Sequence, residues 1–307
     1  MTSGVRERGA GPVVVGSASR DLAPRDPRGW RLGGAVTYAG LALARLGLRP
    51  RVLVGADPDA AAASELELLR DAGAEVRVAA LARSPVFDNR EVGGVRAQVC
   101  LEPGDPLPVD AFPAAWRAAT AWVFGPVADE LPARWAEVPL PAAHVALGWQ
   151  GLLRELPHGG PVRRRPPAPS PLVARADLVV VSRLDLEPGT DVAALGALLR
   201  RDATLVVTDG DLGGSVWRSD GTRAATVRRY PAIATAGVVD ATGAGDAFLA
   251  GLVAARLGHP LAGSGRRGSD LRLAAALGSL TVEGPGVTAV PELTAVAARL
   301  RASLSGG

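Results

Sequence analysis

The sequence predicts an α/β protein built on a doubly wound, mainly parallel β-sheet. Short apolar runs alternate with segments of helical periodicity along the 307 residues. Most of these runs end at Gly, Ser, Thr or another polar residue, as expected where parallel strands present loops at one edge of a sheet. Hydrophobic residues make up 48% of the chain, which is enough for a sizeable core.

The expected strands are short apolar runs bounded by polar or turn residues. Seven runs fit this description: Val13–Val15, 51–54, 75–80, 121–124, 144–147, 178–181 and 204–207. A further strand-like run lies at 236–239, directly before the last glycine-rich motif. Each strand is expected to end at the same edge of the sheet, where ligand-binding loops gather.

Helical spacing predicts three helices that begin near glycine or proline. The first opens at Gly33-Gly34 and stops at Gly47, and the second runs from Asp57 to Gly73. The third begins near Gly245, where Phe248, Leu249, Leu252, Val253 and Leu257 recur at helical spacing.

Two segments break the alternation of strands and helices. Residues 85–101 form two extended pieces around Gly93-Gly94, and residues 20–32 are similarly irregular. Together they are expected to form a small β lid over the edge of the sheet. We expect residues 1–11 to be a flexible tail and residues 12–305 to form a single domain.

Composition excludes several classes of protein. The formal net charge is only +3, and every basic residue is an arginine in short scattered runs, which argues against a nucleic-acid partner. The one cysteine, Cys100, excludes a disulfide framework and is expected to be a small buried residue. Since no apolar run is long enough to cross a membrane, we expect a cytoplasmic protein without a membrane partner.

The stretch DATGAGDAF, Asp240 to Phe248, predicts an anion site with a carboxylate at its mouth. Gly243 and Gly245 let the backbone approach a ligand, and the free amides of the first helical turn favour a phosphate oxygen. Asp246 lies in that first turn, where it would repel a resting phosphate but can accept a hydrogen bond from an incoming hydroxyl. A site of phosphoryl transfer reconciles both features. The alternative is a plain glycine-rich loop before a helix.

Two weaker glycine motifs accompany it. Gly33 and Gly34 at a helix start would let a bound molecule touch backbone, although close helix packing explains them equally well. Thr208 and Gly210, with Gly213 three residues on, give a hydroxyl and free amides that suit nucleotide phosphates. A simple hairpin turn is the alternative there.

Taken in order, these motifs resemble the ribokinase (PfkB-type) carbohydrate kinase family over nearly the whole chain. VVVGSASRD at 13–21 looks like the family's first strand with its substrate-binding Asp, here Asp21. GGAVTYAGLALARLG at 33–47 and DATGAGDAFLAGL at 240–252 look like its two signatures. The run at 274–287, with Ala275 and Gly278, looks like the helix and turn that close over the adenine of ATP.

The resemblance implies a ribokinase-like kinase that moves the γ-phosphoryl group of ATP to a hydroxyl of a sugar or cyclitol. Asp246 would be the general base, and Gly243, Ala244 and Gly245 would form the anion hole. A carboxylate at a helix N-terminus is expected to have a lowered pKa, which would make Asp246 a weak base.

The metal-binding part departs from the family pattern. The usual Asn-x-x-Glu is replaced here by Ser182-Arg183-Leu184-Asp185, so a water-mediated contact to Mg²⁺ is expected from Asp185, with Glu187 as a nearby substitute. Either carboxylate could equally be a solvated loop residue. A monovalent cation near Asp240 is left open, with turn capping as the alternative.

The substrate residues depart from the pattern as well. Tyr38 replaces the family's asparagine and cannot reproduce an amide's paired contacts, which makes ribose a poor candidate. Tyr38, Gln150 and Arg154 resemble the branch that contains myo-inositol kinases, although Gln150 and Arg154 could be an ordinary helix start. Asn89 and Arg90, on the expected lid, could close over the substrate's hydroxyls.

Three readings of function stay open. A kinase for a sugar or cyclitol leads. A non-catalytic nucleotide or sugar sensor on the same fold is the second. A dinucleotide-dependent oxidoreductase is disfavoured, because no G-x-G-x-x-G follows the first strand. A homodimer paired through the lid is expected only slightly more than a monomer.

Overall fold

The computed structural model describes residues 11–92, 95–263 and 268–305. Its central sheet has nine strands in the order β16-β15-β14-β13-β9-β8-β1-β4-β5. Their bounds are β1 Val13–Ser17, β4 Arg51–Ala56, β5 Glu75–Ala80, β8 Ala121–Phe124, β9 His144–Gly148, β13 Leu178–Ser182, β14 Thr204–Thr208, β15 Gly214–Ser219 and β16 Ala224–Tyr230.

The seven strands predicted from the sequence are all present and pair in parallel, so the α/β fold class is confirmed. From β1 the chain runs through β4 to β5 on one side, and through β8, β9 and β13 to β14 on the other. The chain order therefore reverses between β1 and β8. In open α/β sheets such a reversal marks the place where ligands bind, at the carboxyl ends of the strands.

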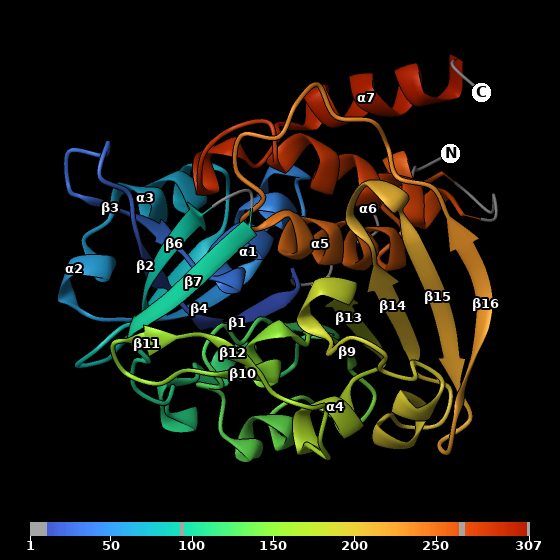
Figure 1. Cartoon of the computed structure of the whole chain (residues 1–307), viewed down its shortest axis with the longest axis horizontal. Coiled ribbons are helices and arrows are strands. Elements are labelled where there is room, and N and C mark those ends of the chain that lie inside the picture. Colours follow the sequence, from blue (N-terminus) through green and yellow to red (C-terminus); the bar gives the residue numbers. More distant parts are fainter. Residues whose placement is uncertain (1–10, 93–94, 264–267, 306–307) are drawn as a thin grey trace, which may run out of the picture.

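Helices cover one face of the sheet and mostly short turns cover the other (Figure 1). The first face carries α1 Ala35–Arg45, α3 Ser64–Asp71, α5 Ala244–Arg256, α6 Ser269–Thr281 and α7 Leu293–Ser305. The second carries α4 Pro171–Arg175 and 3₁₀ turns. Within β13, Val180 packs toward the first face and Val179 toward the second, which explains why the parallel strands read as continuous apolar runs.

Helices α5 and α6 pack closely because α5 carries a glycine at their contact. A Cβ on Gly251 would lie 2.6 Å from the Cα of Ala274. The short separation holds the first turn of α5, with the DATGAGDAF motif, in a fixed place above the sheet. The local reason for a glycine in the middle of this helix is therefore packing, not flexibility.

A second sheet of five strands, in the order β11-β7-β6-β2-β3, includes the segments expected to form a lid, and we call this sheet the lid. Its strands are β2 Ser19–Leu22, β3 Trp30–Gly33, β6 Val86–Val92, β7 Val95–Glu102 and β11 Gly160–Pro161. The segment expected at about 20–32 contains β2 and β3, joined by a turn, and the segment expected at 85–101 contains β6 and β7. That these segments act as a lid stays a prediction. The sequence did not reveal β11, which pairs with Val99 and Cys100 and so covers part of the edge of β7.

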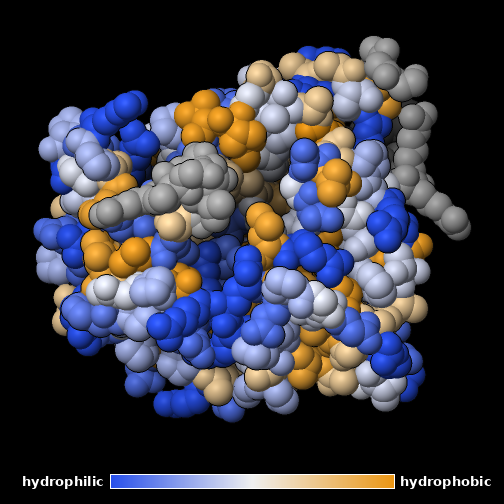
Figure 2. Space-filling model, viewed as in Figure 1, coloured by the Kyte–Doolittle hydropathy of each residue, from blue (hydrophilic) through white to orange (hydrophobic). Residues whose placement is uncertain are grey.

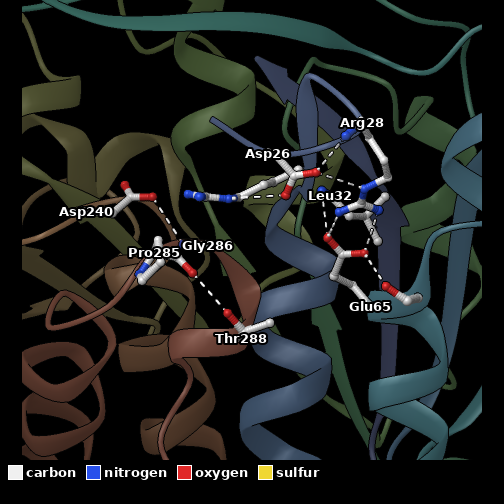
Figure 3. Close-up of polar contacts among 10 residues, drawn as sticks. Asp26, Arg28, Leu32, Glu65, Asp240, Pro285, Gly286 and Thr288 are labelled. Carbon is white, nitrogen blue, oxygen red and sulfur yellow. Dashed lines mark hydrogen bonds and ion pairs between the residues drawn. The ribbon is translucent and has the colours of Figure 1, made fainter. Parts of the chain in front are cut away.

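An ion-pair network fixes the base of the lid. Arg28 donates two hydrogen bonds to the carboxylate of Glu65 on α3, at 2.9 and 2.6 Å, and a third to Asp26 (Figure 3). The Glu65 side chain is only 8% exposed, so its charge depends on Arg28 for compensation. Glu65 also accepts the backbone N–H of Leu32, which joins β3 of the lid to α3 of the main body.

Three sequence expectations need correction. The expected helix from Asp57 to Gly73 is two helices, α2 Pro58–Ala61 and α3, because the chain turns between them at 62–63. Residues 236–239 are exposed coil rather than a strand, since β15 and β16 complete that side of the sheet as an antiparallel hairpin. Residues 1–10 and the turn at Gly93-Gly94 lie outside the described residues. Cys100 is buried, as expected.

Candidate active site

A cleft of about 1600 Å³ opens at the carboxyl edge of the central sheet, next to the switch between β1 and β8. Figure 2, which has the same view as Figure 1, shows a hollow near the middle of the molecular surface. Most of the residues that the sequence singled out as site residues line this cleft: Asp21, Gly34, Tyr38, Asn89, Gln150, Arg154, Ser182, Asp185, Glu187, Thr208, Gly210, Gly213, Gly243, Ala244, Gly245, Asp246, Ala275 and Gly278. Gly33 and Asp240 are not among the lining residues.

The loop before α5 has the backbone geometry of an anion site. Gly243 is the N-cap of α5 and takes the left-handed conformation, with φ of 79°. The turn directs the backbone into α5, whose first amides have no intrahelical acceptor. Gly245 faces open space, since nothing lies within 4 Å of a Cβ added there. A phosphate oxygen can therefore approach the backbone at this point.

Asp246 lies in the first turn of α5, and its pKa is raised to about 7. The main cause is burial among the walls of the cleft, and the negative charge of Asp185 adds to it, while Arg154 opposes it. The lowered pKa expected from the helix N-terminus is therefore wrong for this structure. Asp246 is only half-buried, but the partial loss of water around its carboxylate outweighs the favourable end of the helix dipole. Asp246 is consequently a stronger base than its position in the sequence suggested.

Asp185 is linked to the substrate side of the cleft. Gln150 Nε2 donates a 2.9 Å hydrogen bond to Asp185 Oδ1, so the residue expected at the metal and a residue expected at the substrate are direct neighbours. Glu187 is exposed at the same rim. In the described part of the chain, no group of three or more His, Cys, Asp or Glu side chains is arranged to hold a metal ion. One or two carboxylates still suit Mg²⁺, which usually keeps several waters.

The lid provides polar groups on the opposite wall. Ser19 Oγ donates to Asp21 Oδ1 at 3.0 Å, and Gln98 Nε2 donates to Asn89 Oδ1 at 2.6 Å. Gly33 leaves room for the hydrogen bond between Ser19 and Asp21, because a Cβ at position 33 would lie only 2.7 Å from Ser19 Oγ. Gln98 lines the cleft but was missed from the sequence, since only its cross-strand pairing with Asn89 brings it to the site. The Arg90 side chain lies outside the described part.

Tyr38 lies deep in the wall of the cleft and is only 1% exposed. Its ring packs against the backbone of Gly243, so that a Cβ on Gly243 would overlap the ring. The helix α1, which the first glycine motif opens, thus contacts the loop that the second motif forms. The two signatures, more than 200 residues apart in the chain, meet at this point.

The other end of the cleft lies over β13, β14 and α6. Ser182 Oγ accepts the N–H of Leu184, and Thr208 ends β14 at the turn to β15, so the hairpin expected as an alternative at 208–213 is present. Ala275 and Gly278 face this end from α6. The ring of Tyr230, which the sequence did not single out, stacks on Phe248 at 5.7 Å between centroids.

Asp240 caps the turn that leads into the anion loop. Its two carboxylate oxygens accept the N–H groups of Thr242 at 2.9 Å and Gly286 at 3.2 Å. The second of these contacts is visible in Figure 3, where Asp240 points to the 285–288 turn. Turn capping, the alternative to a cation contact, therefore accounts for this carboxylate.

Glu130 is a buried carboxylate that the sequence gave no reason to select. It is 3% exposed and accepts the N–H groups of Ser17 at 2.9 Å, Val127 at 2.9 Å and Ala128 at 2.8 Å. It thereby joins the carboxyl end of β1 to the loop after β8, on both sides of the switch point. Its donors are all backbone groups, so only the folded chain reveals them.

Comparison with known proteins agrees with this architecture. Residues 167–294 match the model of the pfkB family of carbohydrate kinases. Over 91 residues the chain is 50% identical to acarbose 7(IV)-phosphotransferase of an Actinoplanes species. That match spans 28% of this chain and 28% of the relative.

Solved structures resemble the chain along most of its length. A pyrophosphate-dependent kinase of the ribokinase family, complexed with a pyrophosphate analog and myo-inositol, has a TM-score of 0.70 at 18% identity, covering 94% of this chain and 99% of that one. Ribokinase of Arabidopsis thaliana, complexed with ribose and ATP, has a TM-score of 0.65 at 19% identity, with 95% and 99% covered. At these identities the likeness shows the fold.

None of the helices in the ranges that the structure covers is long and apolar enough to cross a membrane. The family match and the fold agree with each other. Residues 167–294 match the pfkB family of carbohydrate kinases, and the described residues have a ribokinase-like fold.

Proposed function

We propose that this protein is a kinase that transfers the γ-phosphoryl group of ATP to a hydroxyl of a sugar or cyclitol. The observation that carries the proposal is the position of Asp246, a carboxylate of raised pKa in the first turn of α5, beside the exposed backbone of Gly245. A phosphoryl group and a hydroxyl can meet there, with the amides facing one and the carboxylate facing the other.

In the proposed reaction, Asp246 accepts the proton of the acceptor hydroxyl while the hydroxyl oxygen attacks the γ-phosphorus. The bond to the β-phosphate oxygen breaks, and ADP leaves. The amides of Gly243, Ala244 and Gly245 stabilise the charge on the transferring group. Arg154 interacts electrostatically with Asp246 and adds positive charge to the site. Mg²⁺, when bound through Asp185 and Glu187, would neutralise phosphate charge.

The donor is proposed to be ATP because the cleft has apolar lining residues in addition to its polar ones. Ile233, Val238, Ala275 and Val282 are among them and suit the flat apolar face of a nucleobase. Pyrophosphate has no group that would use them. Since one structural neighbour is named as pyrophosphate-dependent, pyrophosphate is the donor to compare with ATP.

The acceptor is proposed to be a polyol that presents several hydroxyls to a polar wall. Asp21, Asn89 and Gln98 come from the lid, and Gln150 and Arg154 come from the sheet. Neighbours named for acarbose and for a myo-inositol complex make these two compounds the first to test. The Tyr38 ring fills space near the anion loop, which keeps ribose a poor candidate.

Formation of the phosphorylated acceptor tests the proposal, followed by release of ADP when ATP is the donor and of orthophosphate when pyrophosphate is the donor. Wild type is incubated with Mg-ATP and, separately, Mg-pyrophosphate, against myo-inositol, acarbose, pentoses, hexoses and nucleosides. Phosphorylation of at least one polyol above the background hydrolysis rate is expected, with a loss of about 10²-fold or more in kcat for Asp246→Asn.

The matched control is Asp270→Asn. Asp270 also lies in the first turn of a helix, α6, but it pairs with Arg228 outside the cleft. Its replacement should leave turnover unchanged. Nucleotide binding without turnover on any acceptor would favour the sensor, and full activity in Asp246→Asn would exclude Asp246 as the base.

A further inference from the structure

We infer that Tyr38 is a positioning residue for the anion loop: its ring supports the backbone at Gly243 and so sets where the first amides of α5 point. The inference rests on the proposed phosphoryl transfer and deepens it. It also assigns a role to the tyrosine that departs from the asparagine of the family pattern, where a contact to the acceptor had been expected. The supporting contact is between the ring and the main chain of the loop.

The contact is close and leaves no space for a larger residue. Tyr38 lies one turn into α1 and is 1% exposed. A Cβ added at Gly243 would overlap Cγ, Cδ1 and Cε1 of the ring, so the Cα of this glycine rests directly on the aromatic surface. Gly243 also needs a φ of 79°, which side chains other than hydrogen rarely allow. The ring and the backbone angle therefore both require a glycine here.

The rest of the loop has less support on this side. At Gly245 nothing lies within 4 Å of an added Cβ, and at Gly278 on α6 the nearest atom is the carbonyl oxygen of Ala244, at 3.3 Å. The loop backbone thus contacts the Tyr38 ring of α1 at Gly243 and contacts α6 at Ala244, while it faces the cleft at Gly245. Removing the ring would remove the contact with α1 and let the loop move toward that helix.

Such a displacement would act on the chemical step. Groups that stabilise a transition state must be placed within a fraction of an ångström, and an error of about 1 Å can cost on the order of 10²-fold in rate. The acceptor wall at Asp21 and Asn89 belongs to the lid and does not depend on this contact. Loss of the ring should therefore lower kcat and leave the KM for the acceptor nearly unchanged.

The first experiment compares Tyr38→Phe with Tyr38→Leu by steady-state kinetics. Phenylalanine keeps the ring and should restore most of kcat, whereas leucine should lower kcat at least about tenfold with the acceptor KM within about threefold of wild type. A Tyr38→Phe enzyme with normal kcat and a strongly raised acceptor KM would show an acceptor contact instead and overturn the inference. So would a Tyr38→Leu enzyme with normal kcat.

The second experiment does not depend on activity, so it separates this inference from the proposed function. Gly243→Ala and Gly258→Ala place a methyl group at nearly the same φ, 79° and 77°, at opposite ends of α5, but only Gly243 has a ring beneath it. In urea unfolding, Gly243→Ala should lower the midpoint clearly more than Gly258→Ala. In the Tyr38→Leu background that excess should largely disappear: the double variant Tyr38→Leu, Gly243→Ala should have a midpoint only slightly below that of Tyr38→Leu alone.

The outcomes are distinguishable. Equal midpoint shifts for the two glycine variants, or no recovery in the double variant, would refute the contact between Tyr38 and Gly243. An absence of turnover in wild type would refute the proposed kinase activity, while the coupling between positions 38 and 243 would still be measured by unfolding.

Discussion

Replacing Asp246 by asparagine should make the protein more stable while it lowers kcat by about 10²-fold or more. The side chains have nearly the same shape, so the main change is loss of the charge. Burial in the cleft raises the pKa of Asp246 from its ordinary 3.8 to about 7, with Asp185 adding to the shift and Arg154 opposing it. A carboxyl whose pKa rises on folding is harder to ionise in the folded state than in the unfolded chain.

The sign and the size of the change in unfolding free energy depend on this difference in pKa. Below about pH 4 the carboxyl is protonated in both states and costs nothing. Between about pH 4 and pH 7 the unfolded chain ionises first, so the wild type loses stability as pH rises, and above about pH 7 the loss is constant. The gap between 3.8 and about 7 corresponds to about 4 kcal/mol at most. Because water reaches the cleft, we expect a gain of about 1–3 kcal/mol for Asp246→Asn at pH 8.

Urea unfolding at about pH 8, 6 and 5 measures this gain. The advantage of Asp246→Asn over wild type should be largest at pH 8 and shrink toward pH 5. The control Asp270→Asn loses an ion pair with Arg228 and should show no gain at any of these pH values. An Asp246→Asn protein no more stable than wild type at pH 8, or a gain that is the same at every pH, would refute the reasoning.

Four further predictions follow from single contacts. The kcat/KM for the acceptor should fall as pH drops through about 7, approaching tenfold per pH unit, because Asp246 must be ionised to act as a base; a flat profile down to about pH 5.5 would contradict this. Glu130→Gln should cost about 2–4 kcal/mol in urea unfolding, since the amide nitrogen faces backbone donors. Gly251→Ala should cost about 1–3 kcal/mol, because its methyl group meets α6 at 2.6 Å from the Cα of Ala274. Arg28→Met should cost about 3 kcal/mol, measured in the same way, by leaving the Glu65 carboxylate buried without its partner.

Local sequence patterns predicted most of the sheet and the motifs of the cleft. The strands of the parallel sheet are buried on both faces, so each appears as a short apolar run that can be recognised without neighbours. The exposed run at 236–239 was misread for the same reason, because two valines in coil cannot be told from a strand by local apolarity alone. The lid strand β11 was missed because two residues carry no periodicity.

The sequence by itself determined the fold class, the extended pieces at 85–101 and the loop with Asp246, because each depends on residues close together in the chain. The tertiary structure decided the pKa of Asp246, the support of Gly243 by Tyr38, the clamp at Glu130 and the pairing of Gln98 with Asn89. These depend on burial and on contacts between distant segments, as between Ser17 and Glu130, which are 113 residues apart. A helix N-terminus lowers a carboxylate's pKa locally, but the walls that partly shield Asp246 from water are brought together only by folding.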